Sequence, residues 1–383
     1  MNKEPLRFKN GKFKIMLLGD LHENYDTEKN NGKAKAEDCL ALLNKAADEL
    51  KPDLVVYLGD NVSADNEMKM RAAVSRIVHP FTTRDIPFAI IFGNHDHDRT
   101  DLVDLQTQMH LFNEHDNCYF FNADDSLTGY GNYNLTVKAT DSDKDVLNLW
   151  FIDSNNLCED RNISYYDWVH EDQINWYKKT AAELKEKNGG KVIPALLFQH
   201  APVPEEYQLL REAKKCEYFD SVDGHGIWSD KRYVLKENVE GYMGEGPCCP
   251  CVNSGEFAAW KEVGDVMGAF FGHDHMNDFT GYVDGILLAQ SKTAGFRPYT
   301  DGCRTGVRLI TLDENNIEDI NTRMYYFKKD FHLKAKSLSP YMRNVSDRQD
   351  IKLKAALTVV GITAGVTATT IAAYKIAKAL RNK

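Results

Sequence analysis

The feature that most limits the possible folds of this chain is an apolar run followed at once by a histidine- or aspartate-bearing cluster, which occurs five times. The runs are rich in Val, Ile, Leu and Phe without polar alternation, which is typical of strands buried on both faces. In open α/β sheets, ligands bind where such strands end. The five segments are KIMLLGDLH (14–22), LVVYLGDN (54–61), FAIIFGNHDHD (88–98), IPALLFQH (193–200) and VMGAFFGHDH (266–275).

Segments with helical spacing of apolar residues separate several of these runs. Residues 34–53 lie between the first two runs, residues 67–86 precede the third, and residues 171–190 precede the fourth. This alternation predicts β-α-β units. Residues 118–153 are instead β-rich and contain a predicted hairpin, and further β-like runs are predicted between residues 284 and 327.

The charge balance limits the class of partner. The chain has 57 acidic and 47 basic residues and a formal net charge of −10. A nucleic-acid surface needs an excess of Lys and Arg, so this composition argues against a nucleic-acid partner. An acidic chain can still surround a metal ion, because carboxylates are metal ligands. The eight cysteines are too sparse for a disulfide scaffold and are interpreted as mostly reduced thiols.

The polar residues at the ends of the five runs are candidate metal ligands. Carboxylate oxygens, amide oxygens and imidazole nitrogens bind hard or borderline dications, and a pair of close metal ions needs a bridging carboxylate. The set contains enough donors for two sites. Its members are Asp20, His22, Asp60, Asn61, Asn94, His95, Asp96, His200, His273 and His275.

The order of these blocks resembles the calcineurin-like metallophosphoesterases over residues 12–327. Five ordered blocks, each after its own strand, are a specific signal, whereas one block alone is weak. The resemblance implies an α/β fold in which a two-sheet β-sandwich is flanked by helices. The matching motifs are D-x-H (Asp20, His22), G-D-N (Gly59 to Asn61), G-N-H-D (Gly93 to Asp96), the isolated His200, and G-H-x-H (Gly272, His273, His275).

Within that superfamily, the chain resembles the purple-acid-phosphatase-like branch. The segments that carry this closer likeness are NSGEF (253–257), residues 264–281 and the helix with Gln173 and Trp176. The purple enzymes have a tyrosine ligand three residues after the second aspartate, where this chain has Ser63. The resemblance therefore implies a branch that lacks the tyrosine ligand and its colour.

Carried over residue by residue, the resemblance implies two divalent or trivalent metal ions, drawn from Mn, Fe and Zn. One ion would be held by Asp20, His22, Asp60 and His275, and the other by Asp60, Asn94, His200 and His273, with Asp60 bridging. Asp274 lies between two ligand histidines. We expect it to accept a hydrogen bond from a metal-bound imidazole rather than to bind metal.

The resemblance also implies a reaction, the hydrolysis of a phosphate ester by in-line attack of a metal-bridging hydroxide without a covalent intermediate. His95 is the expected general acid, and either Asp96 or another acid that the sequence does not identify is expected to orient it, whereas His97 and Asp98 are expected to continue the surface. The alternatives are a phosphodiesterase or pyrophosphatase that acts on nucleotides or lipid headgroups, and an inactive scaffold on the same fold. The substrate class stays open among small molecules, lipid headgroups and phosphoproteins.

Residues 1–327 are predicted to form the metallophosphoesterase domain, followed by a charged connector at 328–350. Inside the domain, residues 203–260 are aromatic and irregular, which is typical of a lid or substrate loop. This loop contains His225, for which a structural role is preferred to a contact with substrate. It also contains Cys248, Cys249 and Cys251, interpreted as incidental thiols or a redox-sensitive pair in preference to a soft-metal site.

Residues 351–383 are predicted to form a transmembrane tail helix, because residues 355–374 are twenty uncharged positions bracketed by Lys and Arg. A soluble alanine-rich helix is the alternative. Gly361 and Gly365 form a G-x-x-x-G pattern that would pack two such helices into a dimer. Since the N-terminal apolar run is too short for a signal peptide, we expect a tail-anchored protein on the cytoplasmic face of a membrane, or else a cytoplasmic one.

Overall fold

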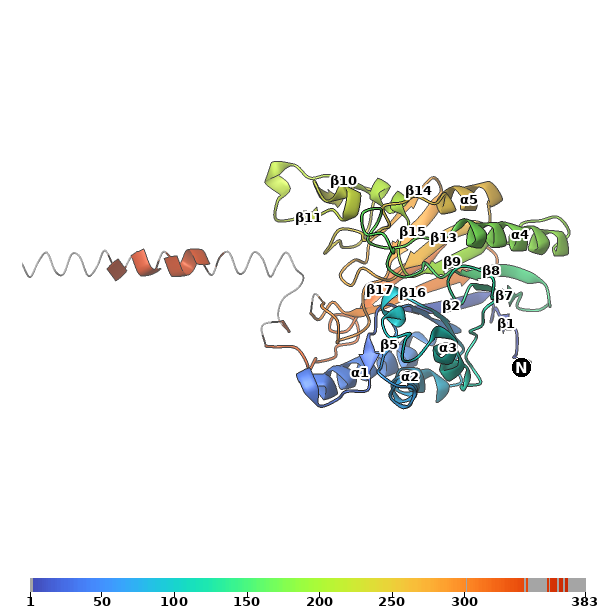
Figure 1. The fold of residues 1–383 in the computed structure, drawn as a ribbon, viewed down its shortest axis with the longest axis horizontal. Coiled ribbons are helices and arrows are strands. Elements are labelled where there is room, and N and C mark those ends of the chain that lie inside the picture. The colour runs from blue at the N-terminus through green and yellow to red at the C-terminus, as the bar shows by residue number, and fades with distance from the viewer. Residues whose placement is uncertain are drawn as a thin grey trace, which may run out of the picture.

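Two large β-sheets lie at the centre of the molecule, with helices on both sides (Figure 1). The computed structural model describes residues 3–300, 302–340 and 342–343, and residues 357, 359–363, 365–367 and 369–370 of the C-terminal segment. This described part is a mixed α/β fold with several sheets. The α/β class expected from the sequence is therefore confirmed.

The five-stranded sheet contains the first three of the five apolar runs. Strands β2, β4 and β6 are parallel, so their carboxyl ends lie at one edge, and β16 pairs antiparallel with β2. The order is β17 (Asn321–Tyr326), β16 (Gly306–Asp313), β2 (Lys12–Leu18), β4 (Leu54–Leu58) and β6 (Phe88–Ile91).

The seven-stranded sheet contains the other two runs. Strands β8, β9, β13 and β15 are parallel, while β7 and β14 pair antiparallel at the flanks of this group. The order is β1 (Leu6–Arg7), β7 (Tyr133–Lys138), β8 (Asp145–Phe151), β9 (Ala195–Gln199), β13 (Val266–Phe271), β15 (Ile286–Gln290) and β14 (Thr280–Val283). The predicted hairpin is the pair β7 and β8.

Alternate residues of the seven-stranded sheet enter two different cores. Leu149 and Phe151 of β8 belong to the cluster that also contains the strands of the five-stranded sheet, and Trp150 belongs to the cluster on the opposite face. Successive side chains of a strand point to opposite faces, so this sheet is covered on both sides. That explains why the sequence shows uninterrupted apolar runs rather than polar alternation.

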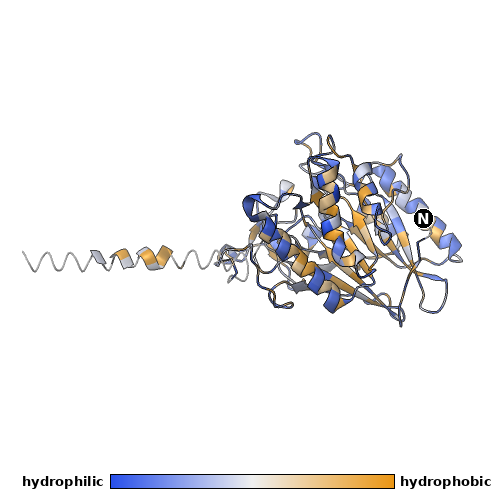
Figure 2. Cartoon of the chain, turned by 90° about the horizontal axis from the view of Figure 1, so that it is seen from below, coloured by the Kyte–Doolittle hydropathy of each residue, from blue (hydrophilic) through white to orange (hydrophobic). Residues whose placement is uncertain are grey.

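The helices close the outer faces of the two sheets. In Figure 1, α1, α2 and α3 lie below the sheets, and α4 and α5 lie above them. Figure 2 shows that helices nearest the viewer carry both hydrophobic and hydrophilic positions, as expected when one helix face is buried. Their bounds are α1 Gly32–Leu50, α2 Glu67–Thr82, α3 Leu105–Asn113, α4 Glu171–Lys187 and α5 Glu256–Val263.

The segment predicted as an irregular lid, residues 203–260, is more regular than expected. It contains a three-stranded antiparallel sheet, short 3-10 helices and α5. Its strands are too short for a two-residue period to be recognised in the sequence. The strands are β10 (Leu210–Glu212), β11 (Val222–Asp223) and β12 (Arg232–Leu235), and the 3-10 helices are η3 (Pro204–Leu209), η4 (Lys215–Glu217) and η5 (Gly226–Trp228).

Two further short elements flank the site. Strands β3 (Glu23–Asn24) and β5 (Val62–Ser63) pair in parallel immediately beyond the ends of β2 and β4. The 3-10 helix η2 (Asn94–His97) follows β6, and η1 (Lys29–Asn31) precedes α1. Chain segments beyond the first two strand ends are thus paired to each other, which fixes the turns between them.

The described part of the predicted connector packs against the domain. Phe331 and Ala335 are buried, and the Asp38 carboxylate of α1 accepts hydrogen bonds from the backbone N–H groups of Lys336 and Ser337. Residues 331–337 of the predicted connector therefore pack against the domain. The division of the chain into domain, connector and tail otherwise stays a prediction.

The predicted membrane-spanning tail is not supported. Within the part of the chain that the structure describes, no helix is both long enough and apolar enough to span a membrane. Residues 357, 359–363, 365–367 and 369–370 are helical, but most of the segment 351–383 lies outside the described residues. Membrane anchoring and the Gly361/Gly365 dimer have no support here, and the cytoplasmic location stays a prediction.

Candidate dinuclear metal site

The ends of the five predicted strands meet between the two large sheets in one largely buried cluster of polar side chains, which we call the pocket below. Backbone hydrogen bonds tie these ends together, from Asp20 N to Gly59 O at 3.3 Å and from Gly272 N to His200 O at 3.1 Å. Gly59 has φ +90°, and a Cβ added there would lie 2.5 Å from His200 Nδ1. Only glycine permits this approach of backbone to imidazole, which explains the glycine of the G-D-N motif.

Four of the predicted ligands have left-handed backbone conformations. Asp20, His22, Asp60 and His273 have φ between 45° and 69°. Residues other than glycine rarely adopt this region, and such strain is concentrated at functional sites. Asp20, Asp60 and His273 each lie two positions after the last residue of a strand. The strained backbone at these four residues therefore marks the place as a candidate functional site.

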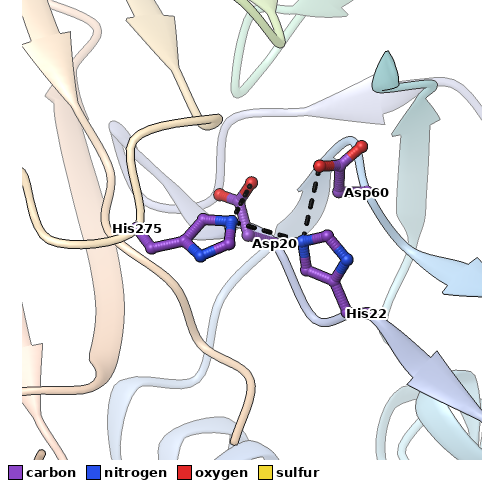
Figure 3. Close-up of side chains that lie close together, drawn as sticks. All are labelled: Asp20, His22, Asp60 and His275. Atoms are coloured by element: carbon purple, nitrogen blue, oxygen red, sulfur yellow. Dashed lines mark hydrogen bonds and ion pairs between the residues drawn. The ribbon is translucent and has the colours of Figure 1, made fainter. Parts of the chain in front are cut away.

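Asp20, His22, Asp60 and His275 form the first cluster, called the Asp20 group below (Figure 3). One ligand atom from each residue lies within 4.8 Å of the others. His22 Nε2 is 3.3 Å from His275 Nε2 and 3.4 Å from Asp60 Oδ2. His275 Nε2 is 3.6 Å from Asp20 Oδ1. The structure therefore brings together all four residues predicted to hold the first ion.

Asp60, Asn94, His200 and His273 form the second cluster, called the His200 group. His200 Nε2 is 3.3 Å from Asp60 Oδ2, 3.2 Å from Asn94 Oδ1 and 3.2 Å from His273 Nδ1. The other ring nitrogen, His200 Nδ1, lies 2.7 Å from the carbonyl oxygen of Leu58. A hydrogen bond to that oxygen orients the imidazole, so Nε2 points to Asp60 and the two groups share this carboxylate.

The donors in these groups fit metal ions. Asp20 Oδ2, Asp60 Oδ2 and His273 Nε2 are buried and have no hydrogen-bond partner among the described residues. A buried polar atom without a partner costs about 1–3 kcal/mol, and bound cations would satisfy the two carboxylate oxygens. Carboxylate, amide and imidazole donors are the types that bind Mn, Fe and Zn.

The electrostatics of the pocket agree with this fit. Burial, with a further contribution from neighbouring His22, lowers the pKa of His275 to about 3, and burial also lowers that of His273. Both imidazoles are therefore neutral at pH 7, the form that binds metal. Burial opposes a charge on His200 as well, but the Asp60 and Asp20 carboxylates outweigh it and raise the pKa to about 10. The pocket thus favours a positive charge beside Asp60, which is a proton on His200 in the metal-free protein and which a bound cation would replace.

The structure places His95 at the solvent side of the Asp20 group. Its ring centroid lies 5.2 Å from that of His22, and its side chain is 50% exposed. Its backbone N–H donates to Asp60 Oδ1 at 2.8 Å. His95 is thus at the site without being in either donor group, as its predicted role requires.

The carboxylate beside His95 is not Asp96 but another acid, the alternative that the sequence left open. Asp96 is buried, and its carboxylate accepts hydrogen bonds from the backbone N–H groups of Gly93, Asn61 and Val62. It therefore holds the two neighbouring strand-end turns in place. Asp98, expected only as surface, lies against the ring instead, with Oδ2 2.7 Å from His95 Nδ1. The 3-10 turn of η2 places residue i+3, not i+1, beside His95.

The role expected for Asp274 is wrong. The Asp274 carboxylate is fully buried and accepts hydrogen bonds from the backbone N–H of Cys248 and from the side chains of Asn277 and Gln290. These bonds fasten the 203–260 segment to the sheet. The ligand imidazole nitrogens have other neighbours, since His275 Nδ1 lies 3.3 Å from the carbonyl oxygen of Tyr299.

Sequence reasoning missed the aromatic residues that border the site. The Tyr166 ring stands edge-on against the His273 ring with centroids 4.4 Å apart, and the Tyr299 ring lies 4.2 Å from that of His275. Both tyrosines belong to segments without strand or helix periodicity. We find no sequence signal that would have identified them.

Several known proteins resemble this chain in sequence or in fold. The family model of the calcineurin-like phosphoesterases matches residues 13–277. A protein of Arabidopsis thaliana named "Probable inactive purple acid phosphatase 29" is 28% identical over 346 residues, which cover 82% of this chain and 80% of that protein. Phosphatase DCR2 of Saccharomyces cerevisiae is 28% identical over 289 residues, which cover 70% of this chain and 45% of that protein.

The solved structures that resemble this chain include a dimetal phosphatase from Danio rerio, which has 11% sequence identity to it and a TM-score of 0.43. That match covers 82% of this chain and 99% of the other. The stretch matched by the family model spans more than half of this chain. It contains all seven predicted ligands: Asp20, His22, Asp60, Asn94, His200, His273 and His275.

Proposed function

Because this chain belongs to the calcineurin-like phosphoesterase family, we propose that it hydrolyses a phosphate ester at the pocket where the two donor groups share Asp60. Members of this family act on phosphorylated substrates, and the pocket contains candidate metal-binding residues. The observation that carries the proposal is the shared carboxylate. Asp60 Oδ2 lies 3.4 Å from His22 Nε2 and 3.3 Å from His200 Nε2, one imidazole from each group.

In this proposal Asp20, His22, Asp60 and His275 hold one ion, and Asp60, Asn94, His200 and His273 hold the other. When bound, two such cations neutralise the phosphate oxygens of the ester and make a water molecule more acidic. The oxygen and nitrogen donors suit Mn, Fe and Zn alike. We further propose that water attacks in line and that no covalent intermediate with the protein forms.

His95 is the proposed proton donor to the leaving oxygen. Its exposed side chain borders the Asp20 group, where an ester entering from solvent would arrive. Asp98 positions it, because a bond from Nδ1–H to Asp98 leaves Nε2 as the atom that holds or gives up the proton. Asp96 accepts hydrogen bonds from three backbone N–H groups and so holds the two strand-end turns rigid.

The second candidate is a scaffold protein on the same fold that turns over no substrate. The Arabidopsis relative is itself named as a probable inactive phosphatase. In this chain the seven predicted ligands and His95 are present at the pocket. An inactive scaffold would have no need for strained, buried carboxylates that lack hydrogen-bond partners. The enzyme is therefore the better supported proposal, whether its substrate is a phosphate monoester, a phosphodiester or a pyrophosphate.

The test combines metal analysis with two model esters, 4-nitrophenyl phosphate and bis(4-nitrophenyl) phosphate. We expect about two metal ions per chain, turnover that a chelator abolishes, and loss of turnover in Asp60→Asn. Asp65→Asn, an exposed aspartate that pairs with Lys69, is the matched control and should retain activity. Absence of metal-dependent turnover on both esters would favour the scaffold.

A further inference from the structure

Three aromatic rings continue outward from the His200 group and form a surface that we call the aromatic rim: Tyr165, Tyr166 and His225. Tyr166 stands edge-on to the predicted ligand His273 at 4.4 Å. His225 lies 5.4 Å from Tyr166, and Tyr165 contacts both at 4.9 Å and 6.3 Å. The rim therefore leads without interruption from the pocket to the surface.

The outer part of the rim is open to solvent. Tyr165 is 51% exposed, and Ile227, two residues beyond His225, is 64% exposed. Exposed apolar side chains that adjoin a site are a common mark of ligand binding, whereas isolated ones need no explanation. Here the exposed residues come from two segments far apart in the sequence, the loop after β8 and the 203–260 segment.

The rim is held in a defined position. Cys251 N donates to Ser164 Oγ at 2.9 Å, which fastens the two segments to each other beside Tyr165. The backbone N–H of His225 donates to the Tyr207 hydroxyl at 2.8 Å. A surface fixed by such bonds loses little conformational freedom when a ligand binds, which favours affinity.

His225 contributes a ring rather than a polar group to this surface. Its Nδ1 is buried and has no hydrogen-bond partner in the part of the chain that the structure describes, so this atom is closed to a ligand that arrives from solvent. The part of His225 that a ligand would contact is therefore the imidazole ring beside Tyr165 and Tyr166.

From these contacts we infer that the aromatic rim binds an aromatic group of the substrate, so that the preferred esters carry a phenyl-like or other planar ring. The inference rests on the proposed phosphoesterase function and narrows its substrate class. Ring edges and faces are the main components of the rim, and aromatic pairs gain from offset or edge-on contact beyond simple burial. A linear acyl chain would bury against the rim without that gain.

The test uses phosphonates, which have no bond for the enzyme to hydrolyse and so separate binding from leaving-group reactivity. Binding of phenylphosphonate, methylphosphonate and hexylphosphonate to the metal-loaded protein is measured by calorimetry. We expect phenylphosphonate to bind about 10-fold more tightly than methylphosphonate. Equal binding of these two, or tighter binding of hexylphosphonate than of phenylphosphonate, would overturn the inference.

Variants locate the effect. Tyr165→Ala and His225→Ala should remove most of the preference for phenylphosphonate and leave methylphosphonate binding unchanged. Tyr282→Ala, an exposed tyrosine on the edge strand β14, is the matched control and should keep the preference. A preference that survives both rim variants would show that the ring binds elsewhere.

The result also separates this inference from the proposed function. Ester turnover without a phenyl preference would overturn the aromatic rim alone. Phosphonate binding with a phenyl preference, but without turnover of any ester, would support the rim and overturn the proposed hydrolysis.

Discussion

The two donor groups that share Asp60 differ in how the protein encloses them. In the Asp20 group the His22 side chain is 20% exposed and borders the solvent-facing His95, whereas in the His200 group the His200 side chain is 1% exposed. An ion in the Asp20 group would exchange with solvent more readily. The difference indicates that the proton donor His95 acts from the more open Asp20 side, whereas the His200 group is the more enclosed of the two.

The largest expected effect comes from the carboxylate that both groups share. Asp60→Asn should lower turnover by about 10⁴-fold, equivalent to about 5.5 kcal/mol of transition-state stabilisation, because it removes a charge from both groups. The Asn side chain keeps an oxygen that can accept from His95 N, so the fold should survive. Steady-state kinetics and circular dichroism measure the two outcomes. Turnover within about tenfold of the wild type would show that Asp60 is not shared.

Variants of the proton donor His95 test whether the reaction takes place at the solvent-exposed Asp20 group. His95→Ala should lower turnover by about 10²–10³-fold while metal content stays unchanged, because His95 is in neither group. Asp98→Asn should give a smaller loss, about tenfold, since the ring stays but is less firmly oriented. His110→Ala, an exposed histidine of α3, serves as the control. Loss of metal in His95→Ala would contradict this division of roles.

Graded chelation tests the difference in enclosure directly. Dialysis of the wild type against increasing chelator should release the two ions in separate steps. His22→Ala should make the first step easier by at least about 10–100-fold in affinity and leave the second nearly unchanged. His200→Ala should weaken the second step. Release of both ions together in the wild type would remove the comparison between the groups.

The smallest expected effect comes from the protonation of Glu206, a side chain buried in the protein interior. Glu206 is fully buried and accepts a hydrogen bond from Gln290, which also bonds to Asp274. Burial, only partly offset by that bond, raises the pKa of Glu206 to about 8. The folded state keeps this proton to a higher pH than the unfolded state, so this contribution to stability is complete below about pH 4.5 and is lost as the pH rises towards 8.

As the pH rises from about 6 to about 8, the loss of the Glu206 proton should therefore lower the free energy of unfolding by about 2 kcal/mol. Glu206→Gln should flatten that part of the profile, whereas Glu49→Gln on the surface of α1 should not. Urea unfolding across this pH range makes the measurement. An unchanged slope in Glu206→Gln would mean that water reaches this side chain.

The strands were predictable because a strand covered on both faces must be apolar, as Leu149 and Trp150 illustrate, and its polar residues come after it ends. This pattern also predicted that Asp20, Asp60, Asn94, His200 and His273 would lie together, although they are far apart in sequence. Their assignment to two metal ions came from the family resemblance and stays a prediction.

The parts that were not predictable depend on local geometry that spacing does not reveal. Asp96 and Asp98 are two residues apart and chemically identical, and only the 3-10 turn of η2 decides that Asp98 reaches His95. The aromatic rim comes from loops whose path has no periodic signal. The same holds for β10, β11 and β12, which are too short to show alternation.

The most direct test of the central claim is a crystal structure of the metal-loaded protein with anomalous scattering recorded at the metal absorption edge. We predict two peaks, one among Asp20, His22, Asp60 and His275 and one among Asp60, Asn94, His200 and His273, with Asp60 touching both. A single peak, or a pair of peaks that does not include Asp60 as a common ligand, would contradict it.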